Sequence, residues 1–186
     1  MTAVYEEPFL VGIDIGTTTT KIAVLAGSER EIIYSDYQRH NARQMESVCL
    51  ILQGFQKMYP DASFRLILTG SGAKPIAQAH KVPFIQEVVA NSVALRREYP
   101  NVRTAIELGG QDAKIIFFHA DSADGSLNVS DMRMNGSCAG GTGAFIDEIA
   151  SILKVPVEEF NSLAEKGSCV YDISGRCGVY AKTDIQ

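Results

Sequence analysis

The fold of this chain is decided by the stretch Phe9–Lys21, which reads FLVGIDIGTTTTK. Residues 9–16 form a short apolar run that ends in an aspartate and a glycine, as is typical of a buried strand. Residues 21–25 (KIAVL) form a second run of the same kind. The residues between the runs, GTTTT at 16–20, suit a tight turn, so the stretch predicts a β-hairpin.

The turn of this hairpin carries groups that can bind phosphate. Hydroxyl groups and backbone N–H groups in a turn that contains glycine can surround a polyphosphate. Asp14 can hold Mg²⁺ directly or through water, and Lys21 can meet a phosphate as a point charge. A hairpin whose threonines simply favour strand structure explains the same residues about as well. Taken alone, the stretch leaves both interpretations open.

A similar pattern recurs in the second half of the chain. Apolar runs at residues 102–108 and 113–118 flank the turn GGQD, and residues 127–134 predict a third strand. In the first half we expect further strands at 31–37 and 65–69, and helices at 44–58, 75–80 and 87–97. The order strand, polar turn, strand, strand, helix therefore occurs twice, which predicts two similar lobes over residues 1–100 and 101–186.

The second turn again places carboxylates beside glycines, with Glu107 before Gly109 and Gly110 and with Asp112 after them. A Gly-Gly hairpin turn is the plain structural explanation. Two such hairpins, one in each lobe, would face each other and hold the β- and γ-phosphates of ATP from both sides. The chain has no G-x-x-x-x-G-K-[ST] motif, so it is not a P-loop protein, and no G-x-G-x-x-G opens a helix.

One cysteine directly precedes a glycine cluster and a helical pattern in residues 134–153, MNGSCAGGTGAFIDEIASIL. The apolar residues of this pattern share one helix face and are Phe145, Ile146, Ile149, Ile152 and Leu153. Free N–H groups and the dipole at the start of such a helix would stabilise Cys138 as a thiolate or as the ligand of a metal cluster. A lone cysteine is more often buried and inert, and that alternative stays open for this stretch alone.

The composition is that of a globular protein, with 46% hydrophobic and 21% charged residues among 186. The net charge of −5 and the absence of a Lys/Arg run argue against a nucleic-acid or anionic-membrane partner. The N-terminus lacks a basic segment and no apolar run approaches membrane-spanning length, so we expect a cytoplasmic protein. Four cysteines in a chain of this length indicate thiols or metal ligands, and not a disulfide scaffold.

Four motifs together resemble one protein family. GIDIGTTTTK and ELGGQDAK are similar to the two phosphate loops of the superfamily of acetate and sugar kinases, Hsp70 and actin. With NGSCAGGTGAF and SGRCGVYAKTDI, the chain resembles the activases of 2-hydroxyacyl-CoA dehydratases and benzoyl-CoA reductases, the BadF/BadG/BcrA/BcrD ATPase type. The resemblance runs from about Leu10 to the last residue.

This resemblance implies an α/β fold of the actin-like, ribonuclease H-like kind, with mixed sheets flanked by helices. The first lobe would be complete over residues 1–100, and residues 101–186 would form the start of a second lobe. The adenosine-binding loop of the family would follow Gln186, as expected for the N-terminal module of a larger activase.

The resemblance also implies that ATP or ADP binds with Mg²⁺. Asp14 and Asp112 would organise Mg²⁺ and its waters. Glu107 stands where the family usually has Asp and would act, with Gln111, in catalysis, either in the Mg²⁺ water shell or by positioning the attacking water. The residues expected to contact the phosphates are Gly16, Thr17, Thr18, Lys21, Gly109, Gly110 and Gln111.

Members of the family share one 4Fe-4S cluster across a homodimer, and the matching ligands here would be Cys138 and Cys177. These two cysteines lie too far apart for a single local site, and a two-fold axis would double their number to the four that a cluster requires. Cys49 and Cys169 match no family ligand, and we expect them to be core residues. The implied function is an ATP-dependent reductive activator, which takes one electron from ferredoxin or flavodoxin and passes it to an iron–sulfur dehydratase or reductase.

Two other functions compete with this one. A small-molecule kinase of the acetate or sugar kinase type would share both hairpins and would leave the cysteines incidental. A binding module whose cysteines hold Zn²⁺ or nothing is less favoured, because zinc sites use clustered local ligands. The iron and sulfide content of anaerobically purified protein distinguishes these alternatives.

Overall fold

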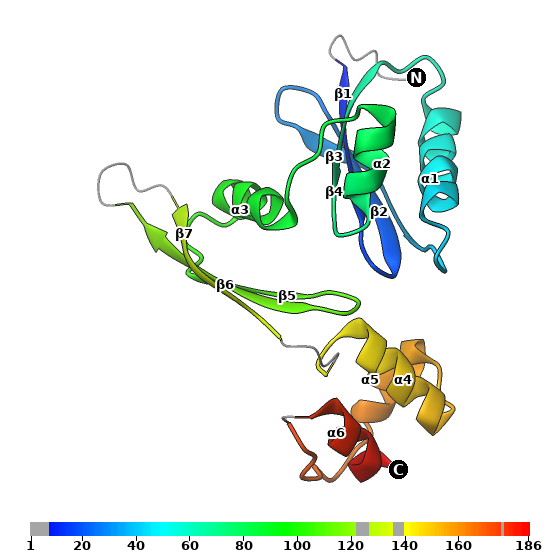
Figure 1. The fold of residues 1–186 in the computed structure, drawn as a ribbon, viewed down its shortest axis with the longest axis vertical. Coiled ribbons are helices and arrows are strands. Elements are labelled where there is room, and N and C mark those ends of the chain that lie inside the picture. The colour runs from blue at the N-terminus through cyan, green and yellow to red at the C-terminus, as the bar shows by residue number, and fades with distance from the viewer. Residues whose placement is uncertain (1–7, 122–126, 136–139, 176) are drawn as a thin grey trace. The chain divides into compact units, whose positions relative to one another are not determined.

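The computed structural model describes residues 8–121, 127–135, 140–175 and 177–186. The chain forms two compact units, residues 1–100 and residues 101–186, each of which contains its own β-sheet (Figure 1). No helix in these described ranges is both long enough and apolar enough to cross a membrane.

Unit 1 contains a four-stranded sheet in the order β3-β2-β1-β4. The strands are β1 (Phe9–Ile15), β2 (Thr19–Ala26), β3 (Glu31–Arg39) and β4 (Phe64–Thr69). β1 pairs antiparallel with β2 and parallel with β4. Every second residue of β1 is buried, from Phe9 to Ile15, because alternate side chains of a strand point to the same face.

Three helices accompany this sheet: α1 (Gln44–Met58), α2 (Ala73–His80) and α3 (Glu87–Glu98). α1 buries Val48, Ile51 and Phe55, whose spacing of three and four residues places them on one helix face. They join the buried residues of β1 and β2 in one hydrophobic core, in which Phe9 and Phe55 meet edge to face at 5.7 Å. The core therefore fixes β1 from one end to the other.

A tight turn after β4 reaches the end of β1. The Gly72 N–H donates to the Ile15 carbonyl at 2.8 Å, and Gly70 adopts a φ of +96°. A Cβ atom on Gly70 would lie 2.3 Å from Asp14 Oδ1 and 2.4 Å from the Ile15 carbonyl oxygen. Only glycine fits such a close backbone approach at positive φ.

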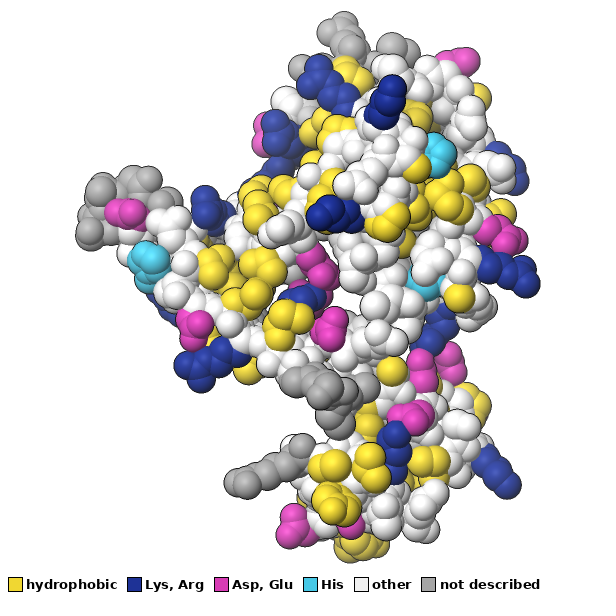
Figure 2. Space-filling model, viewed as in Figure 1, with side chains coloured by type: hydrophobic (Ala, Val, Ile, Leu, Met, Phe, Trp, Pro, Cys, Tyr) yellow, Lys and Arg dark blue, Asp and Glu magenta, His cyan; other side chains and the backbone are white. Residues whose placement is uncertain are grey.

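Unit 2 repeats the antiparallel three-strand order with β5 (Thr104–Leu108), β6 (Ala113–Ala120) and β7 (Leu127–Met134). Its helical elements are α4 (Gly143–Leu153), the 3-10 turn η1 (Val157–Glu159), α5 (Phe160–Ala164) and α6 (Gly178–Ile185). Ile116 and Phe118 of β6 and Ile149 of α4 are among its buried apolar residues. Apolar side chains also reach its surface, including Val179 and Tyr180 on α6, and Figure 2 shows hydrophobic atoms gathered over the part formed by α4, α5 and α6.

The α/β fold class predicted from the sequence is confirmed, and the bounds of α1 and β7 agree with the predicted ranges. The short η1 and α5 were not predicted, because three to five residues are too few to show a helical period. Residues 122–126, between β6 and β7, lie outside the described part of the chain.

Two expectations about burial are wrong. Cys49 and Cys169 are exposed and do not lie in a core. Cys49 follows the buried Val48 on α1 and so points away from the sheet side of the helix, and Cys169 lies in the long segment between α5 and α6. On the predicted apolar face of α4, Ile146 and Leu153 are 41% and 47% exposed.

The contact between Gly70 and β1 predicts an unequal effect of two glycine substitutions. Gly70→Ala and Gly27→Ala both place a Cβ at positive φ, which costs about 1–2 kcal/mol. Nothing lies within 4 Å of a Cβ on Gly27, whereas a Cβ on Gly70 overlaps β1. Gly70→Ala should therefore lower the free energy of unfolding by about 2 kcal/mol more than Gly27→Ala, as measured by urea unfolding with far-UV circular dichroism. Equal losses would contradict this packing.

Candidate functional site

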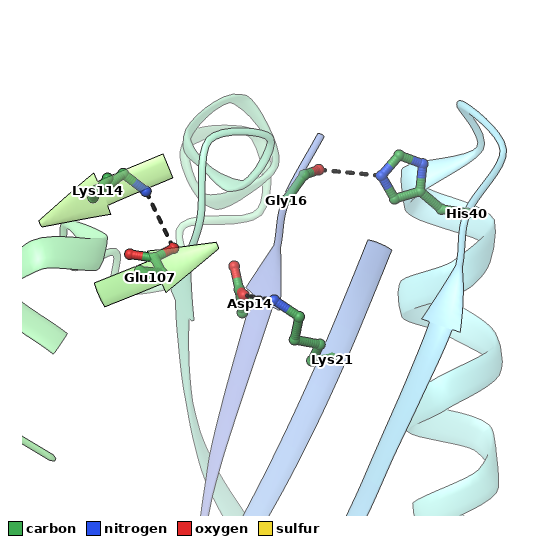
Figure 3. A network of polar contacts seen from close by, with 6 residues as sticks. All are labelled: Asp14, Gly16, Lys21, His40, Glu107 and Lys114. Atoms are coloured by element: carbon green, nitrogen blue, oxygen red, sulfur yellow. Dashed lines mark hydrogen bonds and ion pairs between the residues drawn. The ribbon is translucent and has the colours of Figure 1, made fainter. Parts of the chain in front are cut away.

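The first candidate group is an acid–lysine pair at the end of the β1–β2 hairpin. Asp14 and Lys21 are direct partners in the antiparallel register, and Lys21 Nζ lies 2.7 Å from Asp14 Oδ2 (Figure 3). Partial burial by itself lowers the pKa of Lys21. The hydrogen bond from Lys21 to Asp14 and the charges of Asp14, Tyr37 and Glu87 raise this pKa by a larger amount, so it lies above its ordinary value. Lys21 is thus a cation at neutral pH, and its side chain remains 44% exposed.

The β5–β6 hairpin contains the same pair. Glu107 and Lys114 are register partners, and Lys114 Nζ lies 3.2 Å from Glu107 Oε1 (Figure 3). The Lys114 side chain is only 10% exposed. Lys114 was not predicted as a site residue, although its seven-residue spacing from Glu107 equals that between Asp14 and Lys21.

This register makes Glu107 the counterpart of Asp14. Asp112, predicted to act with Asp14 on Mg²⁺, lies on the far side of the turn, where its carbonyl accepts the Gly109 N–H at 2.8 Å. The structure thus brings Glu107, Gly109 and Asp112 together around one loop of unit 2, while Asp14 and Lys21 belong to unit 1.

Two carbonyl groups of the first hairpin loop, residues 16–18, are hydrogen-bonded to His40. The Gly16 carbonyl lies 3.1 Å from His40 Nε2, and the Thr18 carbonyl accepts the His40 N–H at 3.2 Å. A peptide group is planar and trans, so its N–H points opposite to its carbonyl. The N–H of Thr17, an exposed residue, therefore points away from His40. An N–H presented in this way can bind an anion.

The second hairpin loop, residues 109–112, is held by the start of α4. The Gly143 N–H donates to the Gly109 carbonyl at 2.9 Å, and the Ala144 N–H donates to the Gly110 carbonyl at 2.8 Å. By the same planarity, the N–H groups of Gly110 and Gln111 point away from α4. The first N–H groups of α4 are therefore not all free for an anion, contrary to the expectation from sequence.

Asn135 also forms hydrogen bonds with the β5–β6 hairpin. Its Oδ1 accepts the Ala113 N–H at 3.0 Å, and its own N–H donates to the Ala113 carbonyl at 3.0 Å. Asn135 and Gly143 lie on either side of the segment that contains Cys138, which is outside the described residues. The β5–β6 hairpin is thus hydrogen-bonded to Asn135, which precedes that segment in the sequence, and to Gly143, which follows it.

Cys177 is the N-cap residue of α6. It has extended φ and ψ of −134° and 118°, its carbonyl accepts the Ala181 N–H at 2.9 Å, and it is half-buried. It lines a pocket of about 580 Å³ together with Asn135, Phe145 and Ile173. The described residues include no cluster of three or more His, Cys, Asp and Glu side chains that could hold a metal.

Two sheets that each open with a hairpin carrying an acid–lysine pair define this chain as an α/β protein with the actin-like ATPase fold. The chain belongs to the BadF/BadG/BcrA/BcrD ATPase family, whose family model matches residues 11–186. This match confirms the resemblance inferred from the four motifs.

Two curated relatives are activators of dehydratases. The chain is 28% identical over 179 residues to the (R)-2-hydroxyglutaryl-CoA dehydratase activating ATPase of Acidaminococcus fermentans, covering 95% of this chain and 66% of that protein. It is 28% identical over 183 residues to the 2-hydroxyisocaproyl-CoA dehydratase activator of Clostridioides difficile, covering 95% and 64%. The chain thus spans slightly less than two thirds of the length of these relatives.

Solved structures agree in fold. The crystal structure of component A of the Acidaminococcus fermentans dehydratase matches with a TM-score of 0.77 and 27% identity, over 96% of this chain and 67% of that one. The Clostridium difficile activator with bound ADPNP matches with a TM-score of 0.78 and 27% identity, over 95% of this chain and 63% of that one.

The different burial of the two lysines predicts different effects of their removal. Lys114→Met breaks an ion pair whose lysine is only 10% exposed and which water screens little, so it should lower the free energy of unfolding by on the order of 3 kcal/mol. Lys21→Met removes a lysine that is 44% exposed and should cost about 1 kcal/mol or less. Urea unfolding measures both, and the double variant Glu107→Gln/Lys114→Met should recover part of the loss. A larger loss for Lys21→Met would refute this ranking.

Proposed function

We propose that this chain is the phosphate-binding part of an ATP-dependent reductive activator. It would pass one low-potential electron to an iron–sulfur dehydratase or reductase that acts on CoA esters. The observation that carries the proposal is the pair of hydrogen bonds from α4 to the second hairpin loop. They connect a loop expected to hold phosphate to the helix that follows Cys138. The names of the relatives, which are activators of 2-hydroxyacyl-CoA dehydratases, support the same role.

Each hairpin loop carries groups that would bind phosphate or Mg²⁺. The N–H groups of Thr17, Gly110 and Gln111 point away from the groups that hold their loops, and Lys21 adds a positive charge. Asp14 and Asp112 would hold Mg²⁺ through water. Glu107 and Gln111 would orient the water that attacks the γ-phosphate, and Lys21 would stabilise the charge that develops on the phosphate oxygens.

The two cysteines would supply half of the ligands of a shared cluster. Cys138 and Cys177 from each of two copies would ligate one 4Fe-4S cluster, which when bound supplies one-electron redox chemistry. Cys177 is half-buried at the N-cap of α6 and lines a pocket of about 580 Å³. Ferredoxin or flavodoxin would be the electron donor. Movement of the second hairpin loop with the nucleotide would pass to α4 and so change the surroundings of Cys138.

The iron content tests this proposal. The protein purified anaerobically should contain about four irons per dimer, and Cys138→Ala or Cys177→Ala should remove them, because four thiolates are required. Cys169→Ala is the matched control and should keep the iron, since Cys169 is exposed and assigned no ligand role. Full iron in Cys177→Ala would refute the cluster assignment, and a colourless protein that phosphorylates a small acceptor would favour a kinase.

Two substitutions at Gly143 test the link between the second hairpin loop and α4. Proline is favoured at the first position of a helix, and the preceding Thr142 has the extended φ and ψ (−114°, 171°) that proline requires. Gly143→Pro therefore preserves α4 but removes the N–H that binds the Gly109 carbonyl. Gly143→Ala keeps this N–H, and its Cβ would lie at an ordinary 3.5 Å from the Gly109 oxygen.

Hydrogen exchange of the α4 amides, with and without MgATP, is the measurement. The wild type and Gly143→Ala should show a nucleotide-dependent change of about 5-fold or more, which is the lower end of typical coupling between sites. Gly143→Pro should bind MgATP but lose this response. A response equal to that of the wild type would show that α4 does not sense the nucleotide through this bond.

A further inference from the structure

His40 is a buried residue that contacts the first hairpin loop through both its ring and its backbone. It follows the last residue of β3 and is 4% exposed. Its ring Nε2 lies 3.1 Å from the Gly16 carbonyl oxygen (Figure 3). Its backbone N–H donates to the Thr18 carbonyl at 3.2 Å. One residue therefore holds the carbonyl groups on both sides of Thr17.

The hydrogen bonds of the ring fix its tautomer. The Ala42 N–H donates to His40 Nδ1 at 3.1 Å, so Nδ1 carries no proton. In the neutral ring the proton is then on Nε2, which donates it to the Gly16 carbonyl. Both ring nitrogens are thus used, each in the only role left to it.

The turn after His40 is strained in a way that keeps the ring in place. Asn41 and Ala42 adopt left-handed φ values of 47° and 64°, which cost free energy at a residue with a Cβ. The Arg43 N–H closes the turn by donating to the His40 carbonyl at 2.7 Å. The strained Ala42 is the residue whose N–H reaches Nδ1, so the turn conformation and the orientation of the ring depend on each other.

The peptide group between Gly16 and Thr17 needs such a restraint. Glycine rotates freely about its backbone dihedrals, so this peptide group could turn over and direct its carbonyl oxygen outward in place of the Thr17 N–H. An outward carbonyl would repel a phosphate oxygen, whereas an outward N–H binds one. The hydrogen bond from His40 Nε2 opposes that rotation.

We propose that His40 is a positioning residue for phosphate binding, which holds the first hairpin loop with the Thr17 N–H directed at a phosphate of the nucleotide. The inference rests on the proposed binding of ATP by this chain. His40 itself touches no phosphate, because its ring faces the carbonyl side of the loop.

Two amide substitutions separate the donor from the bulk of the ring. The side-chain nitrogen of glutamine reaches about as far from the backbone as Nε2, and that of asparagine only about as far as Nδ1. His40→Gln can therefore restore the bond to the Gly16 carbonyl, and His40→Asn cannot. Both variants keep the backbone N–H that binds the Thr18 carbonyl.

The experiment is calorimetric titration of the full chain with MgATP and with magnesium pyrophosphate, which needs no adenosine contact. His40→Asn should weaken both by about tenfold, the effect of losing one hydrogen bond of ordinary strength. His40→Gln should stay within about threefold of the wild type. In ¹⁵N-labelled protein, the Thr17 amide signal should shift on addition of pyrophosphate in the wild type and in His40→Gln, and much less in His40→Asn.

The outcomes separate this inference from the proposed function. If the wild type binds neither ligand, the proposed function fails and the role of His40 fails with it. Two results would refute the positioning role alone, given that the wild type binds. In one, His40→Asn binds as tightly as the wild type. In the other, His40→Gln binds as weakly as His40→Asn.

Discussion

The planarity of the peptide group determines what the two hairpin loops can bind. A carbonyl that is hydrogen-bonded on one side of a loop leaves the N–H of the same peptide pointing to the other side. In unit 1 the carbonyl bonded to a side chain belongs to Gly16, and in unit 2 the bonded carbonyls belong to Gly109 and Gly110. The donors differ, a buried imidazole in the first case and the first turn of α4 in the second, but the result is the same. Both loops direct N–H groups away from the protein groups that hold them.

The two acid–lysine pairs occupy equivalent positions in two hairpins but differ in the exposure of the lysine. The pairing across the strands and the seven-residue spacing are alike, yet Lys21 is 44% exposed and Lys114 only 10%. A half-exposed ammonium can exchange its carboxylate for a ligand at little cost, whereas a buried one would leave a charge without compensation. We infer that Lys21 is the lysine that can meet a phosphate, and that Lys114 chiefly holds Glu107 in place.

The sequence predicted what depends on neighbouring residues and missed what depends on distant ones. The period of apolar residues located α1, and the acid, glycine and lysine of the first hairpin indicated its chemistry. His40 was missed because its partner Gly16 lies 24 residues away and nothing in the local pattern signals the contact. The bonds from α4 to the second hairpin loop are equally non-local. Cys49 was expected in the core because free cysteines are usually buried, but the helix periodicity places it outside.

The bonds between α4 and the second hairpin loop also extend the helix electrostatically. The Gly109 and Gly110 carbonyls accept from the first two N–H groups of α4, so their peptide dipoles align with those of the helix. The N–H groups of Gly110 and Gln111 thereby become the positive pole of a helix that geometrically begins only at Gly143. Hydrogen-bonded peptides polarise one another, so a negative charge at these N–H groups strengthens the carbonyl acceptors behind them. Toward an anion, the eleven residues of α4 therefore act as a longer helix, because the peptide groups after Gly109 and Gly110 add their dipoles to its N-terminus.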